Sequence, residues 1–316
     1  MDKEKLKKGG NFLLNNAMFI IILCAVIYIA IEVPAFIKLP SIVNIISLTA
    51  AKLPIALGIA GCIVLTGTDI SAGRVVGLTA CISASLLTTT FKVFPNMTSA
   101  PSIALVILIV LVVGAVVGLV NGFSVAKFKL HPFIVTLSTQ LIVYGCLLMY
   151  IMINGNNGQP LSGLDQSFKD FVTGSHLSVA GVPIPNYVFY AIVVVIFMWF
   201  MWNKTTFGKN MFAVGSSPEA ANVSGVNVMK TTILVHTLAG CMYGITGFIE
   251  SARIGSNQAG TGLNYECDAI AACVIGGVSF VGGTGKISGV VMGVFLLRII
   301  FVALQFLSIN QNLQYI

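Results

Sequence analysis

The residues of this sequence that could do chemistry are charges set inside long apolar segments. Lys52 stands two residues before Pro54 in one such segment, and Asp69 and Arg74 flank the polar text TGTDISAGR. A charge at the centre of a membrane helix costs about 2.5–3.5 kcal/mol on insertion scales, so it usually faces a partner or a polar cavity. Such residues suit the guiding of a polar solute. For Asp69 and Arg74 the simpler interpretation is a local ion pair or cap that fixes the turn, and the alternative is that they line the path. For Lys52 a pore-side or paired lysine is favoured over one that snorkels to the membrane surface.

No pattern in the sequence predicts the making or breaking of bonds. No spacing joins a nucleophile to a base and an orienting group, and no His/Cys cluster has metal-ligand spacing. The text GGTGKISG fails the phosphate-loop pattern, because Phe280 stands where the first glycine should be and Ile287 follows the lysine. We therefore predict that the chain is not an enzyme and holds no metal or cofactor of its own.

The elements that must position these residues are membrane helices. Of the 316 residues 57% are hydrophobic and 9% are charged, whereas soluble domains carry about 25% charged residues. A membrane-spanning helix needs about 20 apolar residues. The apolar runs predict an all-α integral membrane protein with nine crossings, at 17–37, 41–66, 70–90, 103–126, 132–153, 184–202, 231–251, 266–281 and 287–308.

The end of the sequence, SINQNLQYI, predicts an outer turn and an interrupted tenth crossing, as in a gene product cut short. We expect residues 1–316 to form one transmembrane domain, without a separate soluble domain.

The basic residues predict the orientation of this bundle. With a cytoplasmic N-terminus, eleven Lys and Arg residues fall inside and four fall outside, as the positive-inside rule requires. The loop 203–230 is then cytoplasmic and 154–183 is the longest external loop. The net charge of +7 is spread through short loops, which argues against a nucleic-acid partner.

Two glycine-rich segments, 66–74 and 276–289, are too polar for ordinary lipid-facing helix. Irregular backbone at membrane depth is tolerated only where protein or a water-filled cavity surrounds it. We predict broken or re-entrant segments there. The residues expected along a translocation path are Lys52, Asp69, Ser71, Arg74, Gly277, Ser279 and Gly283.

A second glycine pattern predicts close helix packing. Gly114, Gly118 and Gly122 repeat every four residues, and small faces let helix backbones approach closely. This face would pack inside the chain or at a dimer interface.

The charges that flank the last long loop form a third group. Glu250 and Arg253 close one predicted crossing, and Glu266 and Asp268 open the next. A solvated outer rim is the simplest interpretation. The functional alternative is that Arg253, Glu266 and Asp268 dock an external partner.

The cytoplasmic loop contains the text GSSPEAANVSG, which predicts one short helix. Ser217 suits the N-cap, Pro218 the first turn, Glu219 the positive end of the helix dipole, and Gly225 a left-handed stop. So short a helix is not stable alone. We predict that it docks into a groove on a soluble partner; an ordinary surface turn is the alternative.

At these residues the sequence resembles a known family. Glu219, Ala220, Ala221 and Gly225 form the pattern EAA-xxx-G, which resembles the cytoplasmic loop of permease subunits of ABC importers. Longer stretches resemble the sugar-permease branch that serves ribose, xylose and galactose, and the form GTDxSxGR is most similar to galactose/methyl-galactoside permeases. These stretches are TGTDISAGR (66–74), NKTTFGKNMFAVGSSPEAANVSGVNV (203–228), ESARIGSN (250–257) and YECDAIAACVIGGVSFVGGTGK (265–286).

The resemblance implies a ten-helix permease in the bacterial inner membrane that acts as a homodimer, with the path between two copies. The implied partners are a cytoplasmic ATPase that binds ATP and Mg²⁺, an external sugar-binding protein, periplasmic or lipid-anchored, and a monosaccharide such as galactose or glucose. The helix that couples to the ATPase would comprise Ser217, Pro218, Glu219, Ala220, Ala221 and Gly225. Rival hypotheses are a self-sufficient ion-coupled secondary transporter or channel, with Asp69 as its carboxylate, and a membrane sensor or scaffold.

Overall fold

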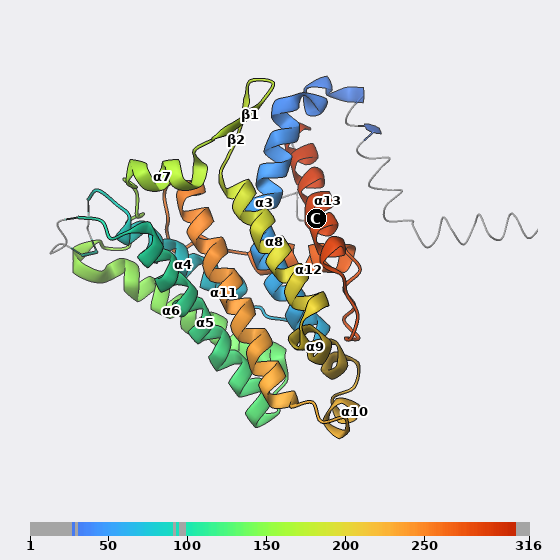
Figure 1. Ribbon diagram of the computed structural model, residues 1–316. Coiled ribbons are helices and arrows are strands. Elements are labelled where there is room, and N and C mark those ends of the chain that lie inside the picture. Colours follow the sequence, from blue (N-terminus) through green and yellow to red (C-terminus); the bar gives the residue numbers. More distant parts are fainter. Residues whose placement is uncertain (1–26, 29–30, 91–92, 95–98, 308–316) are drawn as a thin grey trace, which may run out of the picture. The chain divides into compact units, whose positions relative to one another are not determined.

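The computed structural model describes residues 27–28, 31–90, 93–94 and 99–307, and most of them are helical (Figure 1). The α-helices before the longest external loop are α3 (Leu39–Val64), α4 (Ala72–Leu86), α5 (Ile103–Phe128) and α6 (Pro132–Met152). The later ones are α7 (Gln166–Thr173), α8 (Tyr187–Lys204), α9 (Thr206–Ser216), α10 (Pro218–Val223), α11 (Val228–Ile254), α12 (Tyr265–Ile275) and α13 (Ile287–Phe306). The described part also contains two short 3₁₀-helices, η1 (Pro34–Ile37) and η2 (Ile153–Gly155), and one hairpin of β1 (Leu177–Val179) and β2 (Val182–Ile184).

Six helices of the described residues are long and apolar enough to cross a membrane: α3, α5, α6, α8, α11 and α13. Each of them overlaps one of the predicted crossings, so the prediction of a polytopic all-α membrane protein is confirmed in this coarse form. The predicted first crossing lies largely outside the described residues, and the interrupted tenth lies wholly outside them.

Two predicted crossings differ from the helices observed. α4 has 15 residues and α12 has 11. At about 1.5 Å per residue these helices are about 22 Å and 16 Å long, shorter than a hydrocarbon core of about 30 Å. The predicted boundaries at 70–90 and 266–281 were therefore too wide. Irregular backbone takes over at 65–71 and 276–286, where glycine and polar residues gather.

The described residues belong to two compact units, one made of the chain up to Ile46 and from Phe295 onward, the other of Ser47–Val294. In the first unit, Phe36 of η1 packs edge-on against Phe306 of α13, with ring centroids 5.9 Å apart. The second unit holds every site residue predicted from the sequence.

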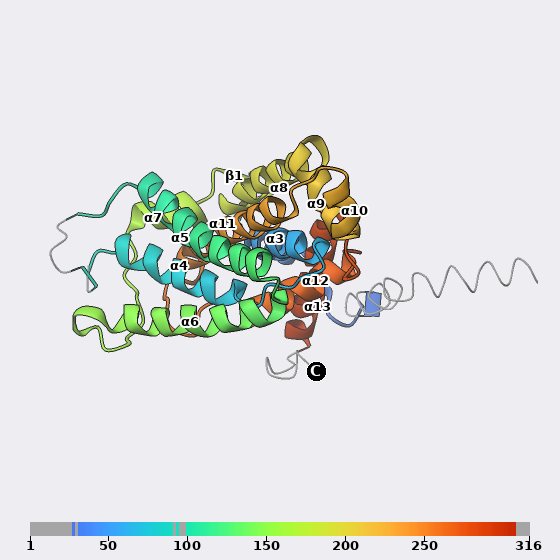
Figure 2. The ribbon, with the colours of Figure 1, turned by 90° about the horizontal axis from the view of Figure 1, so that it is seen from below.

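Helix α11 is the centre of the second unit. It packs along α5 and α4, and α4 also contacts α6 (Figure 2). A Cβ atom added at Gly114 would lie 2.8 Å from the carbonyl carbon of Gly240, and one at Gly118 would lie 2.9 Å from that of His236. The backbones of α5 and α11 therefore touch directly. The predicted packing role of the glycine face is confirmed, and its partner is α11 of the same chain.

The predicted external loop 154–183 contains an ordered helix. Asp165 caps α7 by accepting a hydrogen bond from the Ser167 amide at 2.8 Å. Phe168 of α7 is buried and packs against Phe248 of α11, with ring centroids 5.1 Å apart. This aromatic contact fixes α7 over one end of α11.

The predicted cytoplasmic loop 203–230 is also more ordered than the sequence indicated. It contains α9 as well as the short helix α10. Thr205 caps α9, because its Oγ accepts a hydrogen bond from the Gly208 amide at 3.4 Å. α10 and the β1–β2 hairpin lie at opposite ends of the second unit (Figure 1).

Candidate functional site

The short helix predicted at 215–225 is present as α10, with the predicted ends. The Ser217 Oγ accepts a hydrogen bond from the Ala220 amide at 3.2 Å, Pro218 occupies the first turn, and Glu219 is exposed there. Gly225 has a φ of 84°, the left-handed conformation expected of the stop. The helix signals in the text GSSPEAANVSG are confirmed.

Two backbone hydrogen bonds close the C-terminal end of α10. The Val226 amide donates to the Ala221 carbonyl and the Gly225 amide donates to the Asn222 carbonyl, both at 3.0 Å. This pair of bonds is the Schellman motif, and it requires the left-handed Gly225. Ala221 is buried, while Val223 is 90% exposed. The helix therefore rests on its neighbours through one small residue and presents the rest of its surface.

A groove of about 750 Å³ lies beside α10. One wall is the end of α5, with Val125 and Lys129, and the other wall includes Glu219 and Asn222. Lys129 ends α5 in a left-handed conformation with a φ of 53°. The exposed helix and its groove form one continuous surface of mixed polarity.

Three segments of the chain meet at the base of α10: the end of α3 with the turn after it (64–67), the end of α9 (215–216) and the irregular residues 282–283. We call them the glycine junction. The Gly283 amide donates to the Val64 carbonyl at 2.9 Å. A Cβ at Gly283 would lie 2.9 Å from Cα of Ser216, and one at Gly215 would lie 2.8 Å from the nitrogen of Gly283. The broken segment near 276–289 thus touches the chain directly before the short helix.

Asp69 is fully buried, and both of its carboxylate oxygens are used. Oδ1 accepts hydrogen bonds from the amide and the hydroxyl of Ser71, at 3.0 Å and 2.6 Å, and Oδ2 accepts one from the Tyr243 hydroxyl at 3.2 Å. Asn121 donates to the Ser71 Oγ at 3.0 Å and accepts from the Thr139 Oγ at 2.6 Å. This chain of bonds ties the broken segment to α5, α6 and α11.

Arg74 does not form the predicted local pair with Asp69 in the structure. Its guanidinium donates to the Ala259 carbonyl at 3.2 Å and lies 4.1 Å from the ring centroid of Tyr144. Arg74 therefore joins the start of α4 to the loop after α11 and to α6.

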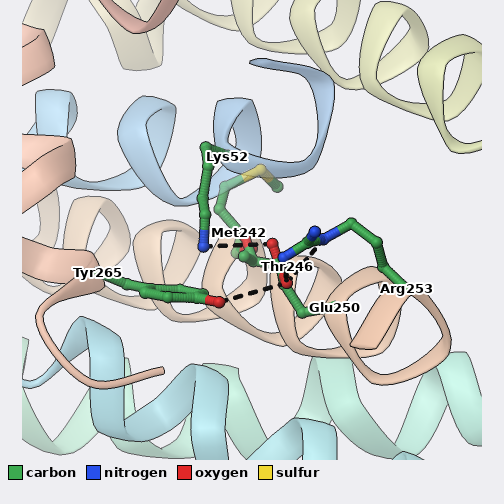
Figure 3. Close-up of polar contacts among 6 residues, drawn as sticks. All are labelled: Lys52, Met242, Thr246, Glu250, Arg253 and Tyr265. Carbon is green, nitrogen blue, oxygen red and sulfur yellow. Dashed lines mark hydrogen bonds and ion pairs between the residues drawn. The ribbon is translucent and has the colours of Figure 1, made fainter. Parts of the chain in front are cut away.

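A buried ionic cluster surrounds Glu250, which has no exposed surface (Figure 3). Lys52 Nζ lies 3.2 Å from Glu250 Oε1. Arg253 donates to Glu250 Oε2 from Nε at 3.0 Å and from Nη2 at 2.7 Å, and the Tyr265 hydroxyl donates to the same oxygen at 3.3 Å. Lys52 Nζ also sits 2.6 Å from the centroid of the Tyr265 ring, a cation–π contact.

The cluster joins three helices at one carboxylate. Lys52 comes from α3, Glu250 and Arg253 from α11, and Tyr265 from α12. Figure 3 shows the side chains converging on Glu250, with Thr246 and Met242 on the preceding turns of α11. The arrangement stabilises one packing of these helices. In the described part of the chain, no group of three or more His, Cys, Asp and Glu side chains is placed to hold a metal ion.

Comparison with known proteins gives the family. A family model described as "Branched-chain amino acid transport system / permease component" matches residues 41–316. The chain belongs to this permease family. It is 45% identical to the galactose/methyl galactoside import permease protein MglC of Salmonella typhimurium over 314 residues, which cover 98% of this chain and 90% of the relative. The same protein of Haemophilus influenzae is 42% identical over 319 residues, covering 100% of this chain and 94% of the relative.

The similarity extends to ribose permeases at lower identity. The ribose import permease protein RbsC of Haemophilus influenzae is 31% identical over 308 residues, which cover 97% of this chain and 90% of the relative. No solved structure matches the permease. The predicted resemblance to sugar permeases is confirmed.

The permease structure brings some predicted site residues together and separates others. Asp69 and Ser71 belong to one network, whereas Lys52 and Arg253 belong to the Glu250 cluster. Glu266 was predicted on the outer rim but is only 4% exposed, so in this conformation it offers little surface to a partner.

Gly277 and Ser279 lie in the irregular segment after α12. Gly277 has a φ of 80°, and the Ser279 amide donates to the Thr284 carbonyl at 3.2 Å. Asp268 is partly exposed on the first turn of α12. Roles of these residues in the path or in docking stay predictions.

Sequence reasoning missed Tyr243, Asn121 and Tyr265. Asn121 had a usable signal, because an amide inside the apolar run of α5 needs a hydrogen-bond partner. The two tyrosines gave no comparable signal, since tyrosines are common at membrane–water interfaces, where water can satisfy the hydroxyl.

The network predicts a structural role for Asp69. Asp69→Asn and Tyr243→Phe should each destabilise the permease by about 1–3 kcal/mol, because each breaks buried hydrogen bonds. The double variant should cost less than the sum, since both changes remove the same bond. Thermal unfolding in detergent measures this. Unchanged stability together with lost transport would instead place Asp69 in direct contact with the transported solute.

Proposed function

We propose that this permease is the membrane subunit of an ATP-driven bacterial importer and that it carries galactose and methyl galactoside. The observation that carries the proposal is the identity of 42–45% to galactose/methyl galactoside import permeases over nearly the whole chain. The location would be the inner membrane, with a cytoplasmic N-terminus. The broken segments at 65–71 and 276–286 would lie at membrane depth and border the path.

The partners follow from this assignment. Each copy of the permease would be one membrane domain of ten helices. Two copies would form the translocation path between them. A cytoplasmic ATPase would bind ATP and Mg²⁺ and hydrolyse ATP, and a periplasmic or lipid-anchored sugar-binding protein would deliver the sugar. The permease itself would be non-catalytic.

The rival hypothesis, an ion-coupled secondary transporter, needs a titratable carboxylate open to the path. Asp69 was its candidate, but Asp69 is fully buried and both of its oxygens accept hydrogen bonds. This geometry favours a fixed structural carboxylate over one that exchanges ions during transport.

Transport in liposomes tests the proposal. Galactose uptake should require the permease, the ATPase, the sugar-binding protein and ATP together. Omitting any one of them should reduce uptake to background. Uptake by the permease alone, driven by a proton or sodium gradient, would refute the importer assignment.

The exposed surface of α10 is the proposed contact with the ATPase. Glu219→Lys reverses the only charge of α10, and we expect it to abolish ATPase capture by the purified permease in detergent. Asp170→Lys makes the same charge change on α7, at the other end of the second unit, and should capture normally. Equal capture of the ATPase by both variants would mean that Glu219 is not part of the docking surface.

A milder change tests the shape of the same helix. Ser217→Ala removes the side-chain cap, which is worth about 1 kcal/mol. Capture of the ATPase should weaken about fivefold, since 1.4 kcal/mol corresponds to a factor of ten. Titration of labelled ATPase measures this. An unchanged affinity would mean that the partner does not need α10 preformed.

A further inference from the structure

The β1–β2 hairpin has one entirely apolar face. Its antiparallel register pairs Leu177 with Ile184 and Val179 with Val182, and Ser178 with Pro183 between them. Successive side chains of a strand point to opposite faces. One face of the hairpin therefore carries the four apolar residues of the two outer pairs, and the other face carries Ser178 and Pro183. The turn at 180–181 has φ values of 47° and 84°, which suit the type I′ turn of a two-residue hairpin.

The apolar face is open along β1, while Val182 and Ile184 of β2 are half-buried, and the hairpin is held in place. Leu177 is 51% exposed and Val179 is 44% exposed. Two-stranded hairpins are marginally stable alone, but here both ends are fixed. The Asn186 amide donates to the Gly174 carbonyl at 2.8 Å, and its side chain donates to the Asp170 carbonyl at 3.1 Å. The permease therefore maintains an exposed apolar surface in a fixed position between α7 and α8.

The chemistry of the hairpin favours a protein over the membrane as its partner. Segments that rest on a bilayer surface use Trp, Tyr, Lys and Arg, and residues 175–186 contain none of them. A two-stranded sheet also has outer edges whose backbone groups cannot be buried in lipid without a hydrogen-bond partner. A protein partner can satisfy these groups. Charge-poor apolar patches are typical of the centres of protein–protein interfaces.

The position of the hairpin identifies the side of the membrane. It precedes α8, whereas α10 follows α8 and α9 at the opposite end of the second unit (Figure 1). Where α10 contacts a cytoplasmic ATPase, the hairpin faces the exterior. We propose that the apolar face of Leu177, Val179, Val182 and Ile184 is a docking surface for the external sugar-binding protein. This inference rests on the proposed importer function.

The test compares the two faces of one strand. The permease–ATPase complex in lipid nanodiscs is titrated with the importer's sugar-binding protein, loaded with galactose. The double variant Leu177→Glu/Val179→Glu should weaken binding at least about tenfold, as loss of a central apolar contact does. Ser178→Glu adds a charge to the opposite face and should bind within about twofold of the wild type. Equal affinity of all three proteins would overturn the proposal.

Two further readouts keep the outcomes distinct. Capture of the ATPase, at the other end of the molecule, shows that a variant is folded. Where the glutamate variant fails this check, Leu177→Ser/Val179→Ser is used, with the same expected direction. Wild-type uptake that needs no sugar-binding protein would refute the proposed function itself. Weaker association of the double variant with lipid, at unchanged affinity for the sugar-binding protein, would assign the face to the membrane and overturn the inference.

Discussion

Gly283→Val should abolish ATP-coupled uptake while the protein still inserts into the membrane. Gly283 has a φ of 67°, where a β-branched side chain is strained by about 1–2 kcal/mol. A side chain there also meets Ser216, whose Cα would be 2.9 Å from the new Cβ. Overpacking of this kind costs about 1–3 kcal/mol more. Because the collision lies in the glycine junction, it separates the base of α10 from the broken segment.

Gly158→Val is the control that separates backbone strain at a positive φ from collision of the new side chain with its neighbours. Gly158 has a similar φ of 72°, but a Cβ there would meet no atom within 4 Å. This variant should keep most of the uptake. Uptake and membrane insertion are measured for both in the same liposomes. Equal activity of the two variants would show that the glycine junction accommodates a side chain and that its close packing is not needed for uptake.

Glu250→Ala should be the most destabilising single change among the described charges. It leaves Lys52 and Arg253 beside an empty position, and removing one partner of a buried ion pair costs about 3–5 kcal/mol. Tyr265 loses its acceptor as well. The free energy of unfolding in detergent is the measurement. Glu219→Ala, which removes an exposed glutamate from α10, should change it by no more than about 0.5 kcal/mol.

A double variant tests whether unpaired buried charge causes the destabilisation by Glu250→Ala. Lys52→Met/Glu250→Gln removes the buried pair together, and replacing both partners is far less costly than breaking the pair. Arg253 can still reach water, because its side chain is 26% exposed. We expect the double variant to recover more than half of the loss. A double variant as unstable as Glu250→Ala would mean that packing of the Glu250 side chain, and not charge, accounts for the effect.

Local chemistry made several features predictable. The ends of α10 depend on Ser217 and Gly225, each of which acts within a few residues of its own position. The six long helices depend on apolar length, and the α5 packing face depends on the regular spacing of Gly114 and Gly118. All of these signals are present in short windows of sequence.

Contacts between distant segments were not predictable in the same way. The bond from Tyr243 to Asp69 joins residues 174 positions apart, and the cluster at Glu250 draws one side chain from each of two other helices. The cost of burying a charge predicted that Lys52 has a partner, but it could not identify that partner. α9 was missed because Gly208 and the polar residues near it are typical of a loop, whereas burial of Met211 stabilises a helix.

The direct backbone contact of α5 and α11 has a mechanical consequence. Two helices that touch through glycines cannot slide past each other without a collision of backbone atoms, so they move together as one rigid body. α11 has 27 residues and is about 40 Å long. It begins four residues after Ser224, at the end of α10, and ends beside the Glu250 cluster. A tilt of about 5° at the α10 end would move the other end by about 3.5 Å over that length. That displacement exceeds the donor–acceptor distance of a hydrogen bond, about 2.7–3.2 Å. A small rotation at one end of the helix pair is therefore enough to break contacts at the other end.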